Sequence, residues 1–453
     1  MLKSWALPRA YQELEERLAQ TIGSQPFSAE IHLRLERIED LLAHLNHPEA
    51  DYPIIHVGGT AGKGSTAMLA AAMLTGAGYE TGLHMSPHLQ IVNERHQVNG
   101  RYAPTSLLLD LYDQLAPCLA EMAETHPFGM PSYFETQLAL SCLLFQACAV
   151  DAAVVEVGLG GMLDATNALP TRVAVITNVG LDHTEILGET VEEIARDKAG
   201  IIKPNQIVVT GARQPSVRAI IAERCAAKGA TLWRLGEEVL YDVHDNGHFD
   251  VRWPGGVVRN LPLNLEGKFQ YENATLAVAA VMALTDGAIP WEGLQRALGT
   301  ARLTGRLEQV QSAPDVWLDG GHNEDKVKAV CDSLPSAEGQ RRFVIALKKG
   351  KAADDILPLL AEHADEIYVT QFYPKGLWQA YDPLELAAIL AEVAPDVPCQ
   401  VISDPDEAVA TALAASTADD LLFVTGSLYL IGDVRERWYP AAEMLARLED
   451  EWQ

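Results

Sequence analysis

A glycine-rich segment near the start of the chain has the residue types needed to hold a nucleotide phosphate. Gly58-Gly-Thr-Ala-Gly-Lys-Gly-Ser-Thr66 lies between a predicted strand and a predicted helix. Successive backbone N–H groups at a helix start can cradle phosphate oxygens, and the helix dipole adds positive potential. Lys63 would reach the terminal phosphates, while Ser65 or Thr66 would offer a hydroxyl to Mg²⁺. The alternative is a tight glycine turn that carries the lysine by chance.

Two other ionisable side chains follow predicted strands. Glu156 lies at the end of the strand over residues 152–157, and His183 follows Asp182 after the strand over residues 173–177. Ligands of α/β proteins bind at the carboxyl ends of the strands. Ser65, Glu156 and His183 are therefore a candidate site for a hard cation such as Mg²⁺, which completes its shell with water and phosphate. The alternatives are a salt-bridged acid and an ordinary loop histidine.

The elements that must position these residues alternate short β-branched runs with helical patterns, as in parallel sheets with crossover helices. In the first two thirds of the chain, strands are predicted over residues 53–59, 152–157, 173–177, 207–210 and 231–235. Helices are predicted over residues 65–76, 134–147, 216–228 and 273–284. A β-hairpin is predicted near residues 239–255, and its Asn246-Gly247 dipeptide favours a type I′ turn.

A second series of strands begins at Val316. The predicted strands cover residues 316–318, 343–347, 366–370, 400–402 and 421–424. Residues 300–305 have no clear periodicity, so we place a domain boundary near residue 302. The prediction is an α/β chain with a larger N-terminal domain, residues 1–302, and a smaller C-terminal domain, residues 303–453.

Composition excludes several classes of protein. The 453 residues include 34 Lys+Arg and 62 Asp+Glu, for a net charge of −28, and no run of four basic residues occurs. Nucleic acids and anionic membranes are therefore unlikely partners. The N-terminus lacks an apolar signal core and no uncharged apolar stretch is long enough to cross a membrane. Six scattered cysteines without metal-site spacing indicate a reduced, cytoplasmic protein.

An ordered series of motifs resembles the folylpolyglutamate synthase/dihydrofolate synthase family of the Mur ligases. The series spans nearly the whole chain and comprises residues 59–65, 86–89, 93–95, 156–161, 164–167, 181–184, 197–202, 270–274, 305–306, 318–323 and 425–427. The resemblance implies a P-loop-containing, Mur-ligase-type ATPase domain followed by a smaller Rossmann-like α/β domain.

The implied activity is ATP-dependent addition of L-glutamate to a folate carboxylate through an acyl phosphate. The acceptor would be a tetrahydrofolate, dihydropteroate or both. The alternative among ligases is a paralogue that joins an amino acid to a different carboxylate. Alternatives outside the ligases are a P-loop kinase or regulatory NTPase, and a catalytically inactive binding protein.

The resemblance also implies roles for individual residues. Those implied to bind ATP are Thr60, Gly62, Lys63, Gly64, Ser65, Thr66, Asn273, Arg306, Asp319 and His322. Two Mg²⁺ would be held by Ser65, Glu156, His183 and Lys198, the last as a carbamate formed with CO₂. Lys63, Lys198 and His183 would serve catalysis. From its local pattern alone, Lys198 is only a cation placed near the carboxyl end of a helix.

Ser86, Pro87 and His88 are implied to bind the pterin substrate, and a proline-stiffened turn is the alternative. The chain departs from the family pattern at three positions. Ala61 removes a side chain but no backbone donor from the phosphate loop, Met162 stands in place of an arginine, and Phe269 stands in place of a frequent histidine. We expect the ATP chemistry to survive, while Met162 leaves the acceptor open.

The charge of −28 also bears on the implied ligands, because ATP, glutamate and the acceptor are anions. Their binding must rest on local positive elements, for which Lys63, Arg306, His322, the loop amides and Mg²⁺ are the candidates. Strong Mg²⁺ dependence and substrate affinity that varies with ionic strength are expected. The site is complete within one chain, so a monomer is expected.

Overall fold

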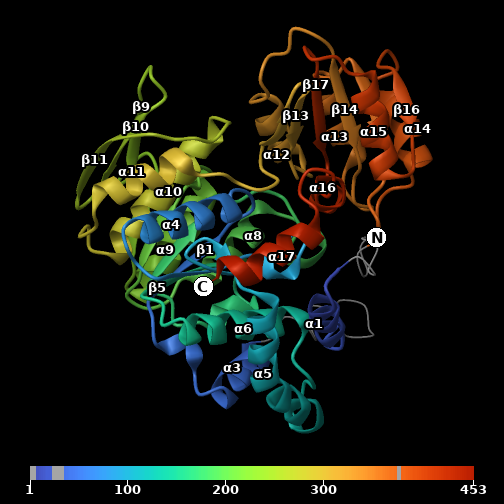
Figure 1. The fold of residues 1–453 in the computed structure, drawn as a ribbon. Coiled ribbons are helices and arrows are strands. Elements are labelled where there is room, and N and C mark those ends of the chain that lie inside the picture. The colour runs from blue at the N-terminus through green and yellow to red at the C-terminus, as the bar shows by residue number, and fades with distance from the viewer. Residues whose placement is uncertain (1–6, 23–34, 375–378, 453) are drawn as a thin grey trace.

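The computed structural model describes residues 7–22, 35–374 and 379–452. Figure 1 shows a larger α/β body formed by the first two thirds of the chain and a smaller α/β body that follows it. Each body has its own sheet, of eight strands in the larger and six in the smaller. The predicted α/β class with two successive sheets is confirmed.

The larger sheet has the strand order β4-β3-β2-β5-β1-β6-β7-β8. Its strands are β1 (Ile54–Gly58), β2 (Thr81–His84), β3 (His96–Val98), β4 (Arg101–Tyr102), β5 (Ala152–Glu156), β6 (Val173–Ile176), β7 (Ile207–Thr210) and β8 (Thr231–Arg234). Six neighbouring strands are parallel, and β3 and β4 continue the sheet antiparallel. The strand that precedes the phosphate loop, β1, is therefore central and buried throughout.

Both faces of this sheet are covered, because successive side chains of each strand point to opposite faces. Ile55 and Val57 of β1 join a core with α4 and α10, whereas Ile54 joins a second core with α5 and α6. A third core under α8 and α9 includes Ala174 and Ile176 of β6. The helices are α1 (Arg9–Ala19), α3 (Leu35–His44), α4 (Lys63–Gly76), α5 (Thr105–Thr125), α6 (Tyr133–Ala147), α7 (Thr184–Leu187), α8 (Val191–Lys198), α9 (Pro215–Lys228), α10 (Phe269–Leu284) and α11 (Trp291–Thr300).

A small antiparallel sheet packs on α10 and α11. It consists of β9 (Leu240–Val243), β10 (Phe249–Trp253) and β11 (Gly256–Leu261), so the predicted hairpin gains a third strand. The predicted type I′ turn is wrong. Of the two turn residues only Gly247 has a positive φ, 78°, and its N–H donates to the carbonyl of His244 at 2.9 Å. The loop contains three residues, as in a type I turn followed by a left-handed glycine.

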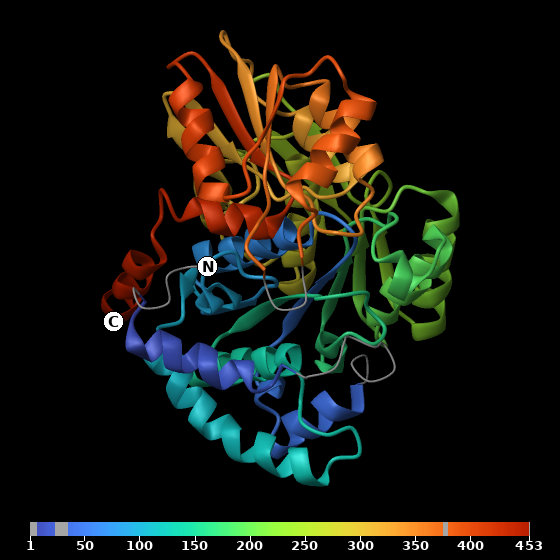
Figure 2. The same cartoon turned by 90° about the vertical axis from the view of Figure 1, so that its right-hand side faces the viewer.

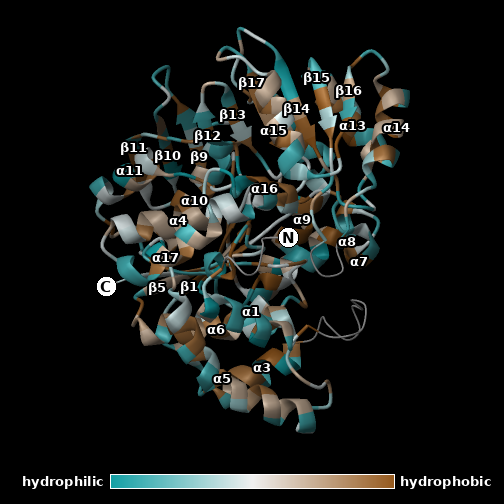
Figure 3. Ribbon diagram, turned by 45° about the vertical axis from the view of Figure 1, so that its right-hand side comes forward, coloured by the Kyte–Doolittle hydropathy of each residue, from teal (hydrophilic) through white to brown (hydrophobic). Residues whose placement is uncertain are grey.

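The smaller sheet has the order β12-β13-β17-β14-β15-β16, with only β12 antiparallel. Its strands are β12 (Glu308–Ser312), β13 (Asp315–Leu318), β14 (Arg341–Ile345), β15 (Glu366–Val369), β16 (Cys399–Val401) and β17 (Leu421–Thr425). Its helices are α12 (Glu324–Cys331), α13 (Ala353–Ala361), α14 (Pro383–Val393), α15 (Pro405–Ala415) and α16 (Leu428–Arg435). Figure 3 shows hydrophobic residues along its central strands, which lie between two apolar cores.

The last helix, α17 (Ala441–Glu451), leaves the smaller body and packs on the larger one. Ala441, Leu445 and Leu448 are buried in the same core as residues of α1 and α5. Figure 2 shows the red C-terminal segment descending from the smaller body along the larger one. The boundary near residue 302 remains a prediction, and α17 shows that the chain crosses back to the larger body after the smaller one.

Candidate active site between the two bodies

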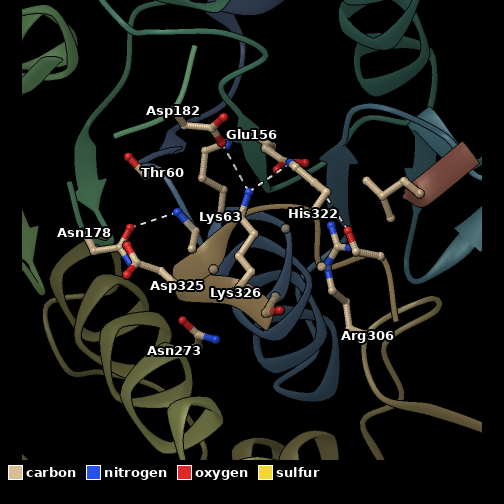
Figure 4. Close-up of a pocket in the computed structure, with 18 of the residues that line it drawn as sticks. Thr60, Lys63, Glu156, Asn178, Asp182, Asn273, Arg306, His322, Asp325 and Lys326 are labelled. Atoms are coloured by element: carbon tan, nitrogen blue, oxygen red, sulfur yellow. Dashed lines mark hydrogen bonds and ion pairs between the residues drawn. The ribbon is translucent and has the colours of Figure 1, made fainter. Parts of the chain in front are cut away.

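A cavity of about 300 Å³ lies between the two bodies and collects most of the predicted site residues. Figure 4 shows Lys63, Glu156 and Asp182 from the larger body near His322 and Lys326 from the smaller one. The lining residues from the predicted set are Thr60, Gly62, Lys63, Gly64, Ser65, Ser86, Pro87, Glu156, His183, Lys198, Asn273, Arg306, Asp319 and His322. Thr66 and His88, also predicted, do not line it.

The phosphate loop connects β1 to α4 and needs glycine at two positions. Gly59 has a φ of 142°, and a Cβ there would lie 1.9 Å from Oγ1 of Thr177. Gly62 has a φ of 79°, and a Cβ there would lie 2.3 Å from Oδ1 of Asn273. Both positions combine a backbone conformation that favours glycine with a close neighbour. The loop is therefore packed tightly against the elements that follow β6 and begin α10.

Two backbone donors of the phosphate loop, those of Thr60 and Ala61, bind Asn178 in the segment that follows β6. Its backbone N–H donates to Oδ1 of Asn178 at 2.8 Å, and the N–H of Thr60 donates to the Asn178 carbonyl at 3.1 Å. These two donors are already used within the protein. The donors that remain for a phosphate therefore include those of the first turn of α4.

The first turn of α4 presents hydroxyl groups next to an acid. The side chain of Thr66 is fully buried, and its Oγ1 has no hydrogen-bond partner among the described residues. Ser65 is 4% exposed and lines the cavity. A Cβ at Gly64 would lie 3.5 Å from Oε1 of Glu156, so the carboxylate lies against this helix start. An unpaired buried hydroxyl at a helix N-terminus suits an anionic ligand.

Glu156 is the last residue of β5, as predicted, and its side chain is 5% exposed. Its Oε2 accepts the backbone N–H of Ser86 at 3.1 Å. Burial raises the pKa of Glu156, and this is opposed by Lys63, by the hydrogen bond from Ser86 and by Arg306. A carboxylate held between these cations is suited to a divalent ion. No three His, Cys, Asp or Glu side chains of the described ranges form a metal-binding group.

His183 follows β6 in a left-handed conformation, with a φ of 52°, and precedes α7. Burial lowers the pKa of the His183 ring, against the opposing effect of Asp182. A neutral imidazole is the form that binds a metal. The ring lines the cavity, so the structure brings His183 together with Glu156 and Ser65, as predicted.

Lys198 is the last residue of α8 and is 5% exposed. Its Nζ donates to the carbonyl of Gly59 in the phosphate loop at 3.1 Å. Burial and the nearby Lys63 lower the pKa of Lys198 to about 7. The predicted place at the carboxyl end of a helix is confirmed, but the side chain is buried rather than solvated, and this burial lowers its pKa. A large fraction of this amine is neutral and nucleophilic near neutral pH.

Asp319 and Arg306 lie where the smaller body begins. Asp319 follows β13, is 3% exposed, and accepts the N–H groups of Leu307 at 2.9 Å and Gly321 at 2.6 Å. Burial raises the pKa of Asp319, opposed by Arg306. Both side chains line the cavity, and Asn273 from α10 faces the phosphate loop opposite them.

His322 is not the positive element that the sequence analysis expected. Burial, together with Lys326 and Lys351, lowers the pKa of His322 well below its usual range. Its Nδ1 lies 2.9 Å from the Gly320 carbonyl and its Nε2 lies 3.2 Å from Nζ of Lys326. A neutral ring that donates from Nδ1 and accepts at Nε2 accounts for both contacts. The cations that the smaller body contributes to the cavity are Arg306 and Lys326.

Lys326 and Lys351 were missed in the sequence. Lys351 Nζ lies 2.8 Å from Oδ1 of Asp182, and Lys326 Nζ lies 3.4 Å from Oδ2 of the same carboxylate. Burial alone would raise the pKa of Asp182, but these lysines hold it well below its usual range. The sequence shows Lys351 within the basic run Lys348-Lys-Gly-Lys351 shortly after β14, but it does not indicate the partner Asp182.

The predicted acceptor segment is only partly in the cavity. Ser86 and Pro87 line it, whereas His88 accepts Nε–H of Arg95 at its Nδ1, 2.9 Å away. Of the two remaining departures, Phe269 lines the cavity and contacts the core of the smaller body. Met162 is 42% exposed and lies outside the lining, so its substitution leaves the nucleotide end of the cavity unchanged.

Two mostly parallel sheets, a glycine-rich phosphate loop and a cavity shared by two bodies define a Mur-type ATP-dependent ligase. Residues 57–281 match the Mur ligase middle domain, and residues 305–428 match the Mur ligase glutamate ligase domain. The chain belongs to the dihydrofolate synthase/folylpolyglutamate synthase family. It is 33% identical over 424 residues to the dihydrofolate synthase/folylpolyglutamate synthase of Bacillus subtilis (strain 168), a match that covers 89% of this chain and 94% of that protein.

Solved structures agree with this assignment. Mycobacterium tuberculosis folylpolyglutamate synthase complexed with ADP matches with a TM-score of 0.86 and 28% identity, over 95% of this chain and 98% of that chain. The bifunctional folylpolyglutamate synthase/dihydrofolate synthase of Yersinia pestis, complexed with AMPPNP and a Mn ion, matches with a TM-score of 0.82 and 28% identity. This match covers 95% of this chain and 99% of that chain. The predicted fold class, family and enzyme class, an ATP-dependent amide ligase of folate metabolism, are confirmed.

In the ranges that the structure describes, every helix is too short or too polar to cross a membrane.

Proposed function

We propose that this chain joins L-glutamate to a carboxylate of a folate compound, with cleavage of ATP to ADP and phosphate. The observation that carries the proposal is that Lys63, Glu156 and Lys198 line one cavity with Arg306 and Asp319 of the second body. A carboxylate oxygen of the acceptor would attack the γ-phosphorus of ATP and expel ADP. The amino group of glutamate would then attack the acyl carbon and expel phosphate.

The nucleotide would lie along the phosphate loop and reach the smaller body. Thr60, Gly62, Gly64 and Ser65, which line the cavity, would surround its phosphates, with Thr66 behind them in the same helix turn. Lys63 would offset charge on the transferred phosphoryl group. Asn273, Arg306, Asp319 and His322 would contact the remainder of ATP from the other side of the cavity.

The donors in the cavity suit Mg²⁺, which prefers oxygen ligands and keeps water and phosphate in its shell. Ser65, Glu156 and His183 would hold one ion, and Lys198, as a carbamate formed with CO₂, would help to hold a second. The lowered pKa of Lys198 supports carbamate formation, because only the neutral amine attacks CO₂. Bound Mg²⁺ would neutralise phosphate charge during transfer.

Ser86 and Pro87 would contact the acceptor at the open side of the cavity, with His88 behind them against Arg95. The acceptor would be dihydropteroate, a tetrahydrofolate or both. We further propose that the enzyme acts as a monomer in the cytoplasm. All six cysteines lie in the described ranges and are free, which suits a reducing compartment.

A coupled assay of ADP release tests the assignment. Dihydropteroate and a tetrahydrofolate are compared as acceptors, each with and without glutamate, under Mg²⁺ and bicarbonate. We expect amide formation and ADP release with at least one of them, dependent on glutamate. If neither acceptor supports turnover, the folate assignment is overturned, and a ligase paralogue that acts on a different carboxylate is favoured.

A further inference from the structure

Side chains of the smaller body converge on one carboxylate of the larger body. Asp182 contacts Nζ of Lys351 at 2.8 Å, Nζ of Lys326 at 3.4 Å and Nδ2 of Asn323 at 3.4 Å. Asp182 lies in the loop after β6, whereas the other three follow β13 and β14. Figure 4 shows Asp182 and Lys326 joined beside Lys63 in the cavity. The contact therefore bridges the two bodies at the site itself.

This bridge is shielded from solvent. The side chains of Asp182, Lys326 and Lys351 are 10%, 20% and 17% exposed. An ion pair in such surroundings is screened less than an exposed pair, and removal of its charge leaves the partners uncompensated. Lys349, in the same loop as Lys351, pairs instead with Glu385 of its own body at 3.8 Å, with both side chains largely exposed. That pair is a control within the same loop.

Asp182 also connects groups on both walls of the cavity. Its Oδ1 accepts the backbone N–H of His183 at 3.2 Å, and its partner Lys326 contacts Nε2 of His322 at 3.2 Å. Movement of the smaller body away from Asp182 would separate these walls. The bodies would still be joined elsewhere, because Gln90 donates to the Tyr439 carbonyl at 2.8 Å and contacts Arg435.

We propose that Asp182 is a positioning residue that holds the cavity closed during ligation by binding Lys326 and Lys351. This inference rests on the proposed function. An acyl phosphate has two fates. Attack by the glutamate nitrogen on the acyl carbon forms the C–N bond, breaks the C–O bond to phosphate and releases a proton. Attack by water breaks the same C–O bond, returns the carboxylate and consumes ATP without product. A closed cavity excludes the water.

The test measures the ratio of ADP released to amide formed. Asp182→Asn keeps the size and hydrogen-bonding capacity of the side chain but removes its charge. We expect the ratio to rise at least about threefold above that of the unaltered protein, and the rate of amide formation to fall about 10- to 100-fold. Lys351→Met is expected to have the same effect, and the double variant to be no worse than either single variant. Lys349→Met is expected to keep the original ratio.

The outcomes separate this inference from the proposed function. If the unaltered protein forms no amide, the proposed function fails and the inference fails with it. If the unaltered protein is active while Asp182→Asn and Lys351→Met keep the original ratio of ADP to amide, the inference alone is overturned. The inference is also overturned if the effects of the two substitutions on this ratio add in the double variant. Additive effects would show that Asp182 and Lys351 do not act through each other.

Discussion

At the end of α8, Lys198 is buried beside Gly59 and Lys63, and its pKa is lowered to about 7. An ordinary lysine, with a pKa near 10.5, would be neutral in about one molecule per thousand at pH 7.5. With its pKa lowered to about 7, Lys198 has a far larger neutral fraction at that pH. This is the difference between a side chain that only carries charge and one that can react with CO₂.

This pKa predicts how carbamylation and activity depend on pH. In bicarbonate, both should rise between about pH 6 and about pH 8, since the neutral fraction of Lys198 rises through its pKa. Lys198→Ala should lower turnover at least about 100-fold and remove the response to bicarbonate. The measurement is carbon-13 NMR of protein in labelled bicarbonate, combined with the turnover assay.

Lys203 provides the matched control. It is also a shielded lysine, and burial lowers its pKa to about 8, but its Nζ contacts Asn167 at 2.9 Å and it does not line the cavity. Lys203→Met should therefore keep the carbamate signal and the bicarbonate response. A signal that persists in Lys198→Ala and disappears in Lys203→Met would refute the assignment.

Site residues differ in how far the sequence could predict them. Lys63, Glu156 and His183 could be predicted, because each lies at the carboxyl end of a parallel strand or in the segment that follows it, where side chains meet. Lys351 could not, because it meets Asp182, 169 residues earlier, only when the two bodies dock. The protonation state of His322 could not be predicted either, because it depends on burial and on two lysines.

At the scale of elements, most parallel strands were predicted to within a few residues, including the edge strands β8 and β16, but the buried parallel strand β2 was missed. β1, β5, β6 and β7 are continuous apolar runs that face helices on both sides. The missed strand β4 has only two residues, and β12 is a polar edge strand. Neither has the apolar pattern from which a strand is predicted.

The junction of β1 and α4 yields a prediction about the phosphate loop. Gly62→Ala places a Cβ 2.3 Å from Oδ1 of Asn273 at a φ of 79°, so the loop must shift. We expect the affinity for ADP to fall about 10- to 100-fold, measured by calorimetry. Gly78→Ala is the control, because Gly78 has a φ of 94° but no described atom within 4 Å of an added Cβ. Unchanged ADP affinity in Gly62→Ala would contradict the role of the loop.

The packing of α6 on β2 and β3 buries two histidines that share one hydroxyl. His84 and His96 each have Nδ1 2.7 Å from Oγ of Ser141, and Nε2 of His96 lies 2.6 Å from Oε1 of Gln137. Burial lowers the pKa of His96 to about 3 and that of His84 well below its usual range. Both rings must therefore be neutral in the folded protein.

This pair makes stability depend on pH. Unfolded histidines gain protons below about pH 6.5, whereas these two do not in the folded state, so stability is lost as pH falls below that value. The free energy of unfolding should fall by about 1.4 kcal/mol per histidine between about pH 7.5 and about pH 5.5. Urea unfolding at both values measures it. In the His84→Asn/His96→Gln variant the change in unfolding free energy between the two pH values should be smaller. A change equal to that of the unaltered protein would refute this explanation.

At the scale of the whole molecule, the net charge of −28 opposes every proposed substrate. The cavity counters this locally, with Lys63, Lys198, Arg306 and Lys326 in its lining. Lys63 and Lys198 belong to the larger body, and Arg306 and Lys326 belong to the smaller one. The complete positive site therefore exists only when the bodies are docked, as they are here through Asp182 and through α17.

The central claim is that this docked cavity activates a carboxylate as an acyl phosphate before an amide forms. The most direct measurement uses an acceptor with oxygen-18 in its carboxylate. The label is followed through one turnover with ATP and glutamate. An acyl phosphate leaves one carboxylate oxygen on phosphate when the amine attacks the carbon. We predict one oxygen-18 atom in the released inorganic phosphate for each amide formed. Phosphate without the label, alongside amide product, would contradict the account.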